Sequence, residues 1–280
     1  MRTTDLPSRG VLVTGSSRGI GRAIALAFAE RGDRVAVHYA HGRADAEQTL
    51  AALPDTGHVL VQADLGDPTA AAALVDDAVA SLGGISVLVN NAATAPDPQN
   101  VHTVQDTSFE DWAAAWDTMV RVNLLGTAHA SWAAARHLVA AGAGGAIVNV
   151  GSRGAFRGEP DYPAYGATKA AVHALGQSVA LALAPHDIAV ASVAPGFVAT
   201  DRQAAKLAGD QGDDLRAQSP FGRVGSPEEV AAAVVYLASP RRGGRPGRCW
   251  TSTGRRTCTP DLAPGGAGGT PGLRARSRAR

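Results

Sequence analysis

The sequence predicts one doubly wound α/β domain, and three features support that fold class. Short runs of valine, isoleucine and leucine alternate with alanine-rich segments of helical length. The runs are apolar at successive positions, which indicates strands buried on both faces of a parallel sheet. With 280 residues and 45% hydrophobic content, the chain is long enough for one large core of this kind.

The elements are expected in a regular order. Strands are expected at GVLVTG (10–15), RVAVHY (34–39), HVLVQAD (58–64), ISVLVNNA (85–92), GAIVNVGS (145–152) and IAVASVAPG (188–196). Helices are expected at about 19–31, 43–53, 68–82 and 108–141, and a later helix carries YPAYGATKA (162–170). Ligands of such sheets bind beyond the carboxyl ends of the strands, so informative side chains should follow each strand.

Charge is distributed unevenly along the chain. The formal net charge is +1, but residues 241–280 hold ten arginines and one acid, whereas residues 1–240 hold 16 basic and 24 acidic residues. The acidic main body predicts no nucleic-acid partner. Because no apolar run of about 18 residues and no signal-like start are present, we expect a cytoplasmic protein without a membrane partner.

Cysteines and metal ligands are scarce in the main body. Both cysteines, Cys249 and Cys258, lie in the basic tail, which excludes a disulfide framework or a cysteine metal site before it. Histidine and acid spacings do not suggest a metal cage. We therefore expect no metal.

A glycine-rich turn, TGSSRGIG, follows the first expected strand. Glycines at 15, 19 and 21 would let the backbone approach a pyrophosphate, and the next helix would present its unpaired N–H groups to it. Elsewhere such glycines would form only a turn. Here a strand precedes them and a helix follows, so the sequence predicts nucleotide binding.

The end of the second expected strand bears on the choice of nucleotide. NAD-specific folds usually place an acid there to bind the ribose 2′-hydroxyl, but this chain has Tyr39, Ala40 and His41. Arg18 and Arg43 are nearby and could bind a 2′-phosphate, although each could also be an ordinary surface charge. We expect NADP(H) to be preferred over NAD(H).

Tyr165 and Lys169 are four residues apart, so on a helix they share a face. Lys169 is one of only two lysines in the chain. A phenol titrates near pKa ~10, and a cation within about 4–6 Å favours its ionised form. The pair has the character of a tuned acid and base. The alternative is an aromatic residue and a lysine on an ordinary half-exposed helix.

Together with further landmarks, these motifs give the chain a family resemblance. The landmarks are Asp64-Leu65, NNAA (90–93), Asn123 in VNLLG, Ser152, Tyr165, Lys169 and PGFVAT (195–200). Over roughly residues 8–240 the chain resembles the short-chain dehydrogenase/reductase family, in its shorter branch, and is similar to 3-oxoacyl-[acyl-carrier-protein] reductases. The resemblance implies a Rossmann fold and hydride transfer between NADP(H) and a carbonyl or alcohol substrate.

The resemblance also implies roles for individual residues. Tyr165 would be the general acid and base, Ser152 would orient the substrate oxygen, Lys169 would lower the phenol pKa and hold the nicotinamide ribose, and Asn123 would fix a proton-relaying water. The residues implied to bind the cofactor are Gly15, Ser17, Arg18, Gly19, Ile20, Gly21, Tyr39, Asp64, Leu65, Asn91, Ala92, Tyr165, Lys169, Pro195, Gly196, Val198 and Thr200. A small-molecule substrate and a homo-oligomer, tetramer or dimer, are implied as well. The alternative is a catalytically silent nucleotide-binding or scaffolding protein.

The change in composition near residue 240 predicts a domain at 1–240 followed by a basic tail at 241–280 that we expect to be disordered. Relatives continue with a last strand where this chain reads RPGRCWTSTG, so we expect that strand to be missing. A frameshift would explain the arginine, glycine and proline composition of the tail. A basic arm that binds nucleic acid and a solvated extension without a task remain alternatives.

Overall fold

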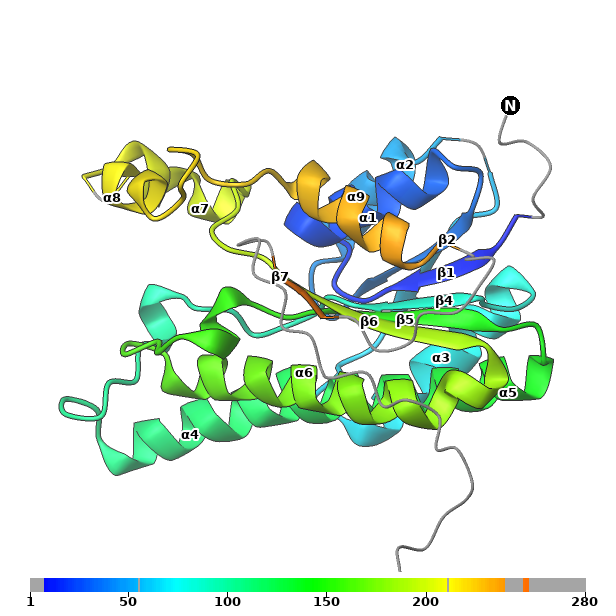
Figure 1. The fold of residues 1–280 in the computed structure, drawn as a ribbon, viewed down its shortest axis with the longest axis horizontal. Helices are drawn as coiled ribbons and strands as arrows, with labels where there is room; N and C mark the ends of the chain where they lie inside the picture. The colour runs from blue at the N-terminus through cyan, green and yellow to red at the C-terminus, as the bar shows by residue number, and fades with distance from the viewer. Residues whose placement is uncertain (1–7, 55, 211, 240–248, 252–280) are drawn as a thin grey trace, which may run out of the picture.

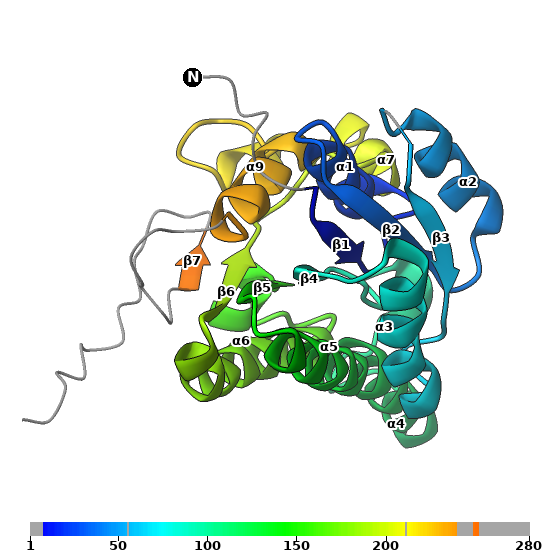
Figure 2. The same cartoon turned by 90° about the vertical axis from the view of Figure 1, so that its right-hand side faces the viewer.

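The fold is built on one parallel sheet, seen in a computed structural model that describes residues 8–54, 56–210, 212–239 and 249–251. Within these residues the strand order is β3-β2-β1-β4-β5-β6-β7. Figures 1 and 2 show the sheet between two layers of helices. The strands are β1 (Gly10–Val13), β2 (Arg34–Tyr39), β3 (Val59–Gln62), β4 (Val87–Asn90), β5 (Gly145–Val150), β6 (Ile188–Ala194) and β7 (Cys249–Thr251).

Two groups of helices cover the two faces of this sheet. One face packs against α1 (Gly19–Ala29), α2 (Arg43–Ala52) and α9 (Pro227–Leu237), and the other against α3 (Pro68–Leu82), α5 (Thr127–Ala141) and α6 (Pro163–Leu183). Successive strand residues point to opposite faces. Accordingly, Val11 and Val13 lie in the first core and Leu12 lies in the second. The predicted doubly wound fold is confirmed.

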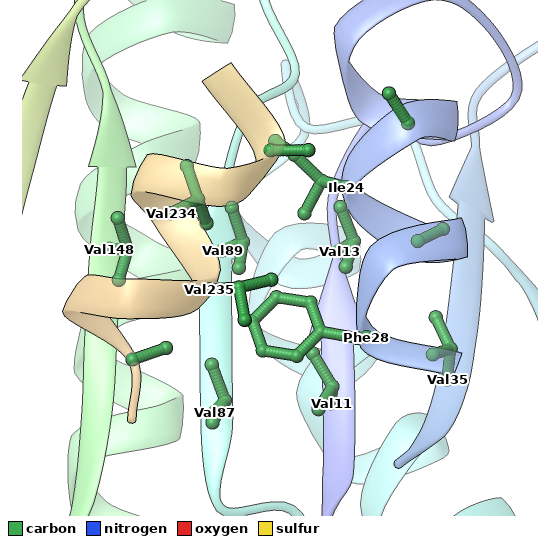
Figure 3. Packing of buried hydrophobic residues seen from close by; sticks show 14 of the residues in the cluster. Val11, Val13, Ile24, Phe28, Val35, Val87, Val89, Val148, Val234 and Val235 are labelled. Atoms are coloured by element: carbon green, nitrogen blue, oxygen red, sulfur yellow. The ribbon is translucent and has the colours of Figure 1, made fainter. Parts of the chain in front are cut away.

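The first core brings distant parts of the chain together. Figure 3 shows Phe28 of α1 packed against Val235 of α9 and the strand residues Val11 and Val87. Phe28 is completely buried, and truncating such a ring to alanine costs about 3–5 kcal/mol. Helix α9, near the end of the described chain, therefore packs directly against α1, the helix that follows the glycine turn.

The expected helix at 108–141 is divided in the structure. Helix α4 (Phe109–Met119) passes through a π-helical segment, η2 (Val120–Gly126), into α5. A Cβ on Gly126 would lie 2.6 Å from the Leu65 carbonyl oxygen, so this glycine allows the segment to approach the loop after β3. Periodicity alone could not distinguish this bulge from a straight helix.

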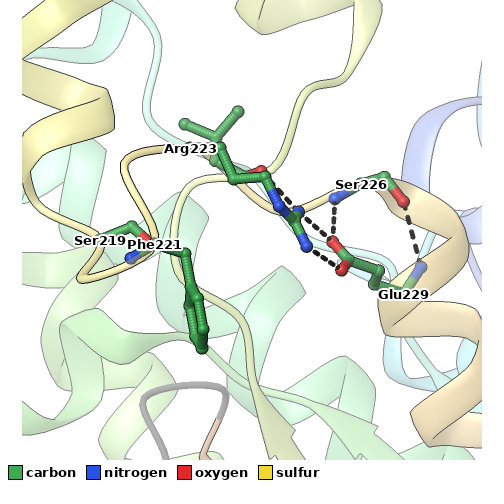
Figure 4. Close-up of polar contacts among 6 residues, drawn as sticks. Ser219, Phe221, Arg223, Ser226 and Glu229 are labelled. Atoms are coloured by element: carbon green, nitrogen blue, oxygen red, sulfur yellow. Dashed lines mark hydrogen bonds and ion pairs between the residues drawn. The ribbon is translucent and has the colours of Figure 1, made fainter.

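The segment 201–221 forms the short helices α7 (Asp201–Ala208) and α8 (Gly212–Ala217), which lie apart from the sheet in Figure 1. Helix α9 then begins with a capping box between Ser226 and Glu229. Glu229 also accepts from both terminal nitrogens of Arg223, at 2.8 and 2.6 Å, as Figure 4 shows. These contacts fix the start of α9, where the chain passes from the outer helices α7 and α8 to the core.

The prediction that the last strand is missing was wrong. Residues Cys249–Thr251 pair in parallel with Ser192–Ala194 of β6 and form β7. Pairing uses backbone groups, so three residues suffice, and Trp and Thr favour extended structure. The strand covers an edge of β6 that would otherwise be open. The remainder of the tail, 241–248 and 252–280, lies outside the described residues, as does any effect of a frameshift there.

Strands β2 and β3 are added on one side of β1, and strands β4 to β7 are added on its other side, so the order in which the chain adds strands reverses at β1. Such a switch point opens a crevice at the carboxyl ends of these strands. Within the described residues, none of the helices combines the length and apolar character that crossing a membrane requires.

Candidate active site

A cleft of about 630 Å³ opens at the switch point. Every residue predicted to bind the cofactor lines it, from Gly15 in the first turn to Thr200 after β6. Ser152, Tyr165 and Lys169 line it as well, whereas Asn123 does not. The structure thus brings three of the four predicted catalytic residues and the glycine turn into one site.

The glycine turn requires its glycines for steric reasons. Gly15 and Gly19 have φ angles of 62° and 56°, in the left-handed region that favours glycine. A Cβ on Gly21 would lie 2.2 Å from the Gly15 carbonyl oxygen and 2.6 Å from the Asn91 amide nitrogen. Glycine at these three positions therefore allows the turn to close tightly before α1, and the unpaired N–H groups at the N-terminus of α1 fit a nucleotide phosphate.

Asn91 holds the glycine turn in place. Its amide nitrogen donates to the carbonyl oxygens of Thr14 and Gly15, both at 2.9 Å. The Thr14 hydroxyl in turn accepts from the backbone nitrogens of Asn91 and Ala92. The loops after β1 and β4 are locked to each other, so the Asn91 side chain acts on the turn as well as lining the cleft.

His38 is a residue that sequence reasoning missed. Its Nδ1 accepts from the Gly15 backbone nitrogen at 2.9 Å, so its other nitrogen, Nε2, carries the proton and donates to the Ala63 carbonyl at 3.1 Å. Burial lowers the pKa of His38 to about 4 and keeps the ring neutral. A histidine inside the apolar run RVAVHY was the signal that could have indicated this link between the glycine turn and β3.

The end of β2 carries mixed charges. Arg18 is exposed, and Arg43 lies in an exposed ion pair with Glu47 at 2.8 Å. The Arg43 pKa is raised mainly by its hydrogen bond to Glu47, with a smaller contribution from Tyr39. Asp45, a carboxylate that lies beyond positions 39–41 in the chain, also lines the cleft here.

Tyr165 and Lys169 lie on one side of α6, as their spacing predicts. The Lys169 Nζ atom is 5.8 Å from the centroid of the Tyr165 ring. Lys169 is 4% exposed, and its ammonium donates to the Val150 carbonyl at 2.8 Å. Burial lowers the pKa of Lys169 to about 8. The lysine is thus a buried cation at the floor of the cleft.

The expected lowering of the Tyr165 pKa is not observed. Burial raises this pKa, because it disfavours the charged phenolate. A hydrogen bond with Ser152 and the charge of Arg202 act in the opposite direction, while Glu159 raises the pKa further. The net direction is upward, so the phenol is held in its protonated form, which is the form that can donate a proton.

Ser152 begins the turn that follows β5. Its hydroxyl oxygen accepts from the Gly154 backbone nitrogen at 3.1 Å and caps the 3₁₀ segment η3 (Arg153–Phe156). The hydroxyl also bonds to Tyr165. This arrangement positions two hydroxyl groups together at the cleft, where both can reach one substrate oxygen.

Asn123 is buried behind the cleft. Its side-chain oxygen accepts from the Thr94 backbone nitrogen at 2.7 Å, and its amide donates to the Thr94 carbonyl and the Thr168 hydroxyl. These contacts tie the π-helical segment to the loop after β4 and to α6. The side chain has a structural role here, and the water-relay role of Asn123 stays a prediction.

His102 is a second residue that sequence reasoning missed. It is fully buried, and its Nε2 accepts from the backbone nitrogen of Ala164 at 3.1 Å, in the first turn of α6. Its Nδ1 donates to the Asn100 carbonyl at 2.7 Å. Tyr162, the N-cap residue, makes no side-chain cap bond, so His102 satisfies a helix N–H group and fixes the start of the helix that carries Tyr165.

Trp112 and Trp116 pack against each other on α4 with their ring centroids 5.8 Å apart, and Trp112 also contacts His102. Neither tryptophan lines the cleft. In the part of the chain that the structure describes, no three His, Cys, Asp or Glu side chains gather as a group able to hold a metal ion.

Comparisons with known proteins place this site in a wider context. Residues 15–251 match a protein-family model described as enoyl-(acyl carrier protein) reductase, so the match includes β7. The chain is 38% identical over 237 residues to an L-rhamnose 1-dehydrogenase (NAD(P)(+)) of Sphingomonas sp., covering 84% of this chain and 90% of that protein. It is 34% identical to a 3-oxoacyl-[acyl-carrier-protein] reductase of Staphylococcus aureus, covering 83% and 91%.

Solved structures agree with these sequence relatives. A short chain dehydrogenase from Burkholderia cenocepacia, solved in complex with NADP, superposes with a TM-score of 0.77 at 34% sequence identity. The similarity covers 87% of this chain and 95% of that one. The likeness therefore extends over nearly the whole of the fold described above.

Proposed function

We propose that this chain, which belongs to the short-chain dehydrogenase/reductase family and is an NAD(P)-dependent oxidoreductase, interconverts a carbonyl and an alcohol with NADP(H). In this proposal Tyr165 is the proton donor and acceptor. The observation that carries the proposal is the meeting of Tyr165, Ser152 and Lys169 in the cleft that the glycine turn borders. When bound, the nicotinamide supplies or accepts the hydride.

The protein residues divide the remaining work. Tyr165 gives its proton to the substrate oxygen in reduction and takes it back in oxidation. Ser152 donates a hydrogen bond to the same oxygen and orients it. Lys169 contributes a buried positive charge that favours the phenolate formed when Tyr165 has given up its proton. Asn123 would fix a water that returns protons toward Lys169.

The cofactor fits the residues that are present. The cradle formed by Gly15, Gly19 and Gly21 would be filled by any Cβ at position 21, and α1 presents its N-terminus there. The other residues proposed to hold the cofactor are Ser17, Arg18, Ile20, Tyr39, Asp64, Leu65, Asn91, Ala92, Pro195, Gly196, Val198 and Thr200.

We expect NADP(H) to bind more tightly than NAD(H). Positions 39–41 carry no carboxylate to repel a 2′-phosphate, and Arg18 is exposed at the turn. Asp45 opposes this preference, because its negative charge lines the same end of the cleft. The Sphingomonas relative is named for both nucleotides and the Burkholderia structure holds NADP, which is compatible with a preference of modest size.

Titration and turnover assays test the proposal. NADPH and NADH are titrated by fluorescence, and NADPH oxidation is then measured against sugars, cyclic ketones and 3-oxoacyl thioesters. Tighter binding of NADPH and turnover of one class support the proposal. Equal or tighter binding of NADH would contradict the cofactor preference. Binding without turnover of any class would favour the alternative, a catalytically silent nucleotide-binding protein. A homo-oligomer and a cytoplasmic location stay predictions.

A further inference from the structure

Arg153 occupies the position next to Ser152 and reaches across the outer part of the cleft. Its guanidinium lies over the ring of Phe197, with 4.3 Å between the guanidinium carbon and the ring centroid. Both residues line the cleft, and Arg153 is half-buried. A guanidinium stacked in this way keeps its N–H groups in the ring plane available for a planar acceptor.

Two guanidinium groups converge on one uncharged oxygen beside the cleft. The Gln218 side-chain oxygen accepts from Arg153 at 2.6 Å and lies 3.4 Å from a terminal nitrogen of Arg157. Burial lowers the Arg153 pKa first, and the charge of Arg157 lowers it further, because like charges repel. Glu159 opposes that effect from a distance. Among the described residues, neither arginine has a carboxylate within 4 Å.

We propose that Arg153 and Arg157 form an anion subsite that binds a carboxylate or phosphate group of the substrate, with Gln218 holding the place of an anionic oxygen. This inference rests on the proposed function, since it assumes a substrate carbonyl at Tyr165 and Ser152. It assigns the substrate to the class of small oxo or hydroxy compounds that carry an oxyanion.

Charge and chain geometry both support this assignment. A carboxylate or phosphate would replace a neutral acceptor by an anionic one and would relieve the repulsion between the two guanidiniums. Ser152 and Arg153 are neighbours in the chain and both line the cleft. The anion bound by Arg153 would therefore belong to the same molecule whose carbonyl oxygen Ser152 binds.

A binding experiment tests the subsite independently of turnover. Cyclohexanecarboxylate and its uncharged analogue cyclohexanecarboxamide are titrated by calorimetry into the NADPH-saturated protein. We expect the carboxylate to bind at least about tenfold more tightly than the amide, and we expect Arg153→Gln to remove most of this difference. Arg136→Gln is the matched control, because Arg136 stacks on Trp132 at 5.2 Å outside the cleft. Equal binding of both probes by the wild-type protein would overturn the inference.

Kinetics separate the two sources of the anion. One pair of substrates is 4-oxocyclohexanecarboxylate and its primary amide, and the other is dihydroxyacetone phosphate and dihydroxyacetone. For at least one pair we expect kcat/KM to favour the anion, and we expect Arg153→Gln to reduce that ratio by about tenfold or more. A preference in the first pair alone identifies a carboxylate, and one in the second alone identifies a phosphate. If Arg153→Gln lowers kcat/KM equally for the charged and uncharged members, Arg153 acts only through the Ser152 turn and the subsite is wrong. A wild-type protein that binds the carboxylate probe but turns over neither these four compounds nor any class in the wider substrate screen would contradict the proposed function and leave the subsite supported.

Discussion

Different kinds of contact stabilise the two ends of the cleft: the glycine-turn end, where the cofactor is proposed to bind, and the end near α7 and α8, where the substrate is proposed to bind. At the glycine turn, buried or half-buried hydrogen bonds join Thr14, Gly15, His38 and Asn91 across three strands. At the other end, α7 and α8 rest on exposed contacts such as the Arg216–Asp213 ion pair. Phe221 beyond them is 88% exposed. The difference indicates a rigid cofactor end and an adaptable substrate end, because exposed ion pairs contribute little to stability.

The strongest test of the rigid end is Gly21→Ala. The added Cβ would lie 2.2 Å from the Gly15 carbonyl oxygen, which is backbone and cannot yield without moving the turn. We expect NADPH affinity to fall by roughly 100-fold or more, as measured by fluorescence titration. Gly158→Ala is the matched control at the substrate end, since its Cβ would meet nothing within 4 Å. NADPH binding by Gly21→Ala at wild-type affinity would contradict the description of the cradle.

We expect acid to lower the free energy of unfolding, because a buried neutral histidine at the rigid end resists protonation in the folded protein. Burial lowers the pKa of His38, which bonds to the glycine turn, from 6.5 to about 4. Outside the glycine turn, burial and the charge of Lys169 lower the pKa of His173 on α6 in the same way. Because the unfolded chain takes up protons first, stability is complete above pH 6.5 and falls as the pH drops toward 4. The loss reaches about 3 kcal/mol for His38. Urea unfolding at pH 7, 5.5 and 4.5 measures this loss, and His38→Gln should show a smaller one. The same pH dependence in that variant would show that His38 is not one of the groups responsible.

A smaller effect is expected for Asn91→Ala, which removes the two hydrogen bonds to the Thr14 and Gly15 carbonyls. We expect the dissociation constant of NADPH to rise about tenfold and the free energy of unfolding to fall by about 1–3 kcal/mol. Gln62→Ala is a useful comparison, because Gln62 makes one exposed bond to the Ala40 carbonyl. If both variants bind NADPH equally well, the Asn91 lock has no role in cofactor binding.

The smallest effect is expected at the substrate end, for Arg223→Met. This change removes the exposed ion pair with Glu229 but leaves the Ser226–Glu229 capping box. We expect the melting temperature to change by no more than about 2 °C, measured by scanning calorimetry. The hydrogen bond from Arg223 and the one from the Ser226 backbone nitrogen lower the Glu229 pKa to about 2, so the shift should become smaller in the variant. A loss of stability as large as that of Asn91→Ala would remove the contrast between the two ends.

The contrast also explains what could be predicted from the sequence. The glycine turn and the succession of strands and helices along the chain follow from short motifs and local periodicity. Gly15, Gly21 and the Tyr165–Lys169 pair, which those motifs singled out, all line one cleft. His38 and His102 act through backbone groups far away in the chain. A histidine inside an apolar run marks His38 as unusual, but no local pattern identifies which backbone groups are its partners. The upward shift of the Tyr165 pKa depends on burial, which spacing alone does not measure. The strand β7 depends on backbone pairing with β6 and was obscured by the tail composition.

The substrate end was the least predictable part. Its helices α7 and α8 carry many charges and few buried apolar side chains, so the sequence has little apolar periodicity from which to predict how they pack. The convergence of Arg153 and Arg157 on Gln218 joins residues more than 60 positions apart and could be recognised only in three dimensions.

The central claim is that Tyr165 supplies the proton, and Tyr165→Phe tests it most directly. The variant keeps the ring and removes only the hydroxyl. We expect kcat to fall by about 10²- to 10⁴-fold, while the dissociation constant of NADPH stays within about twofold of the wild-type value. A variant that keeps near wild-type kcat and binds NADPH normally would contradict the account.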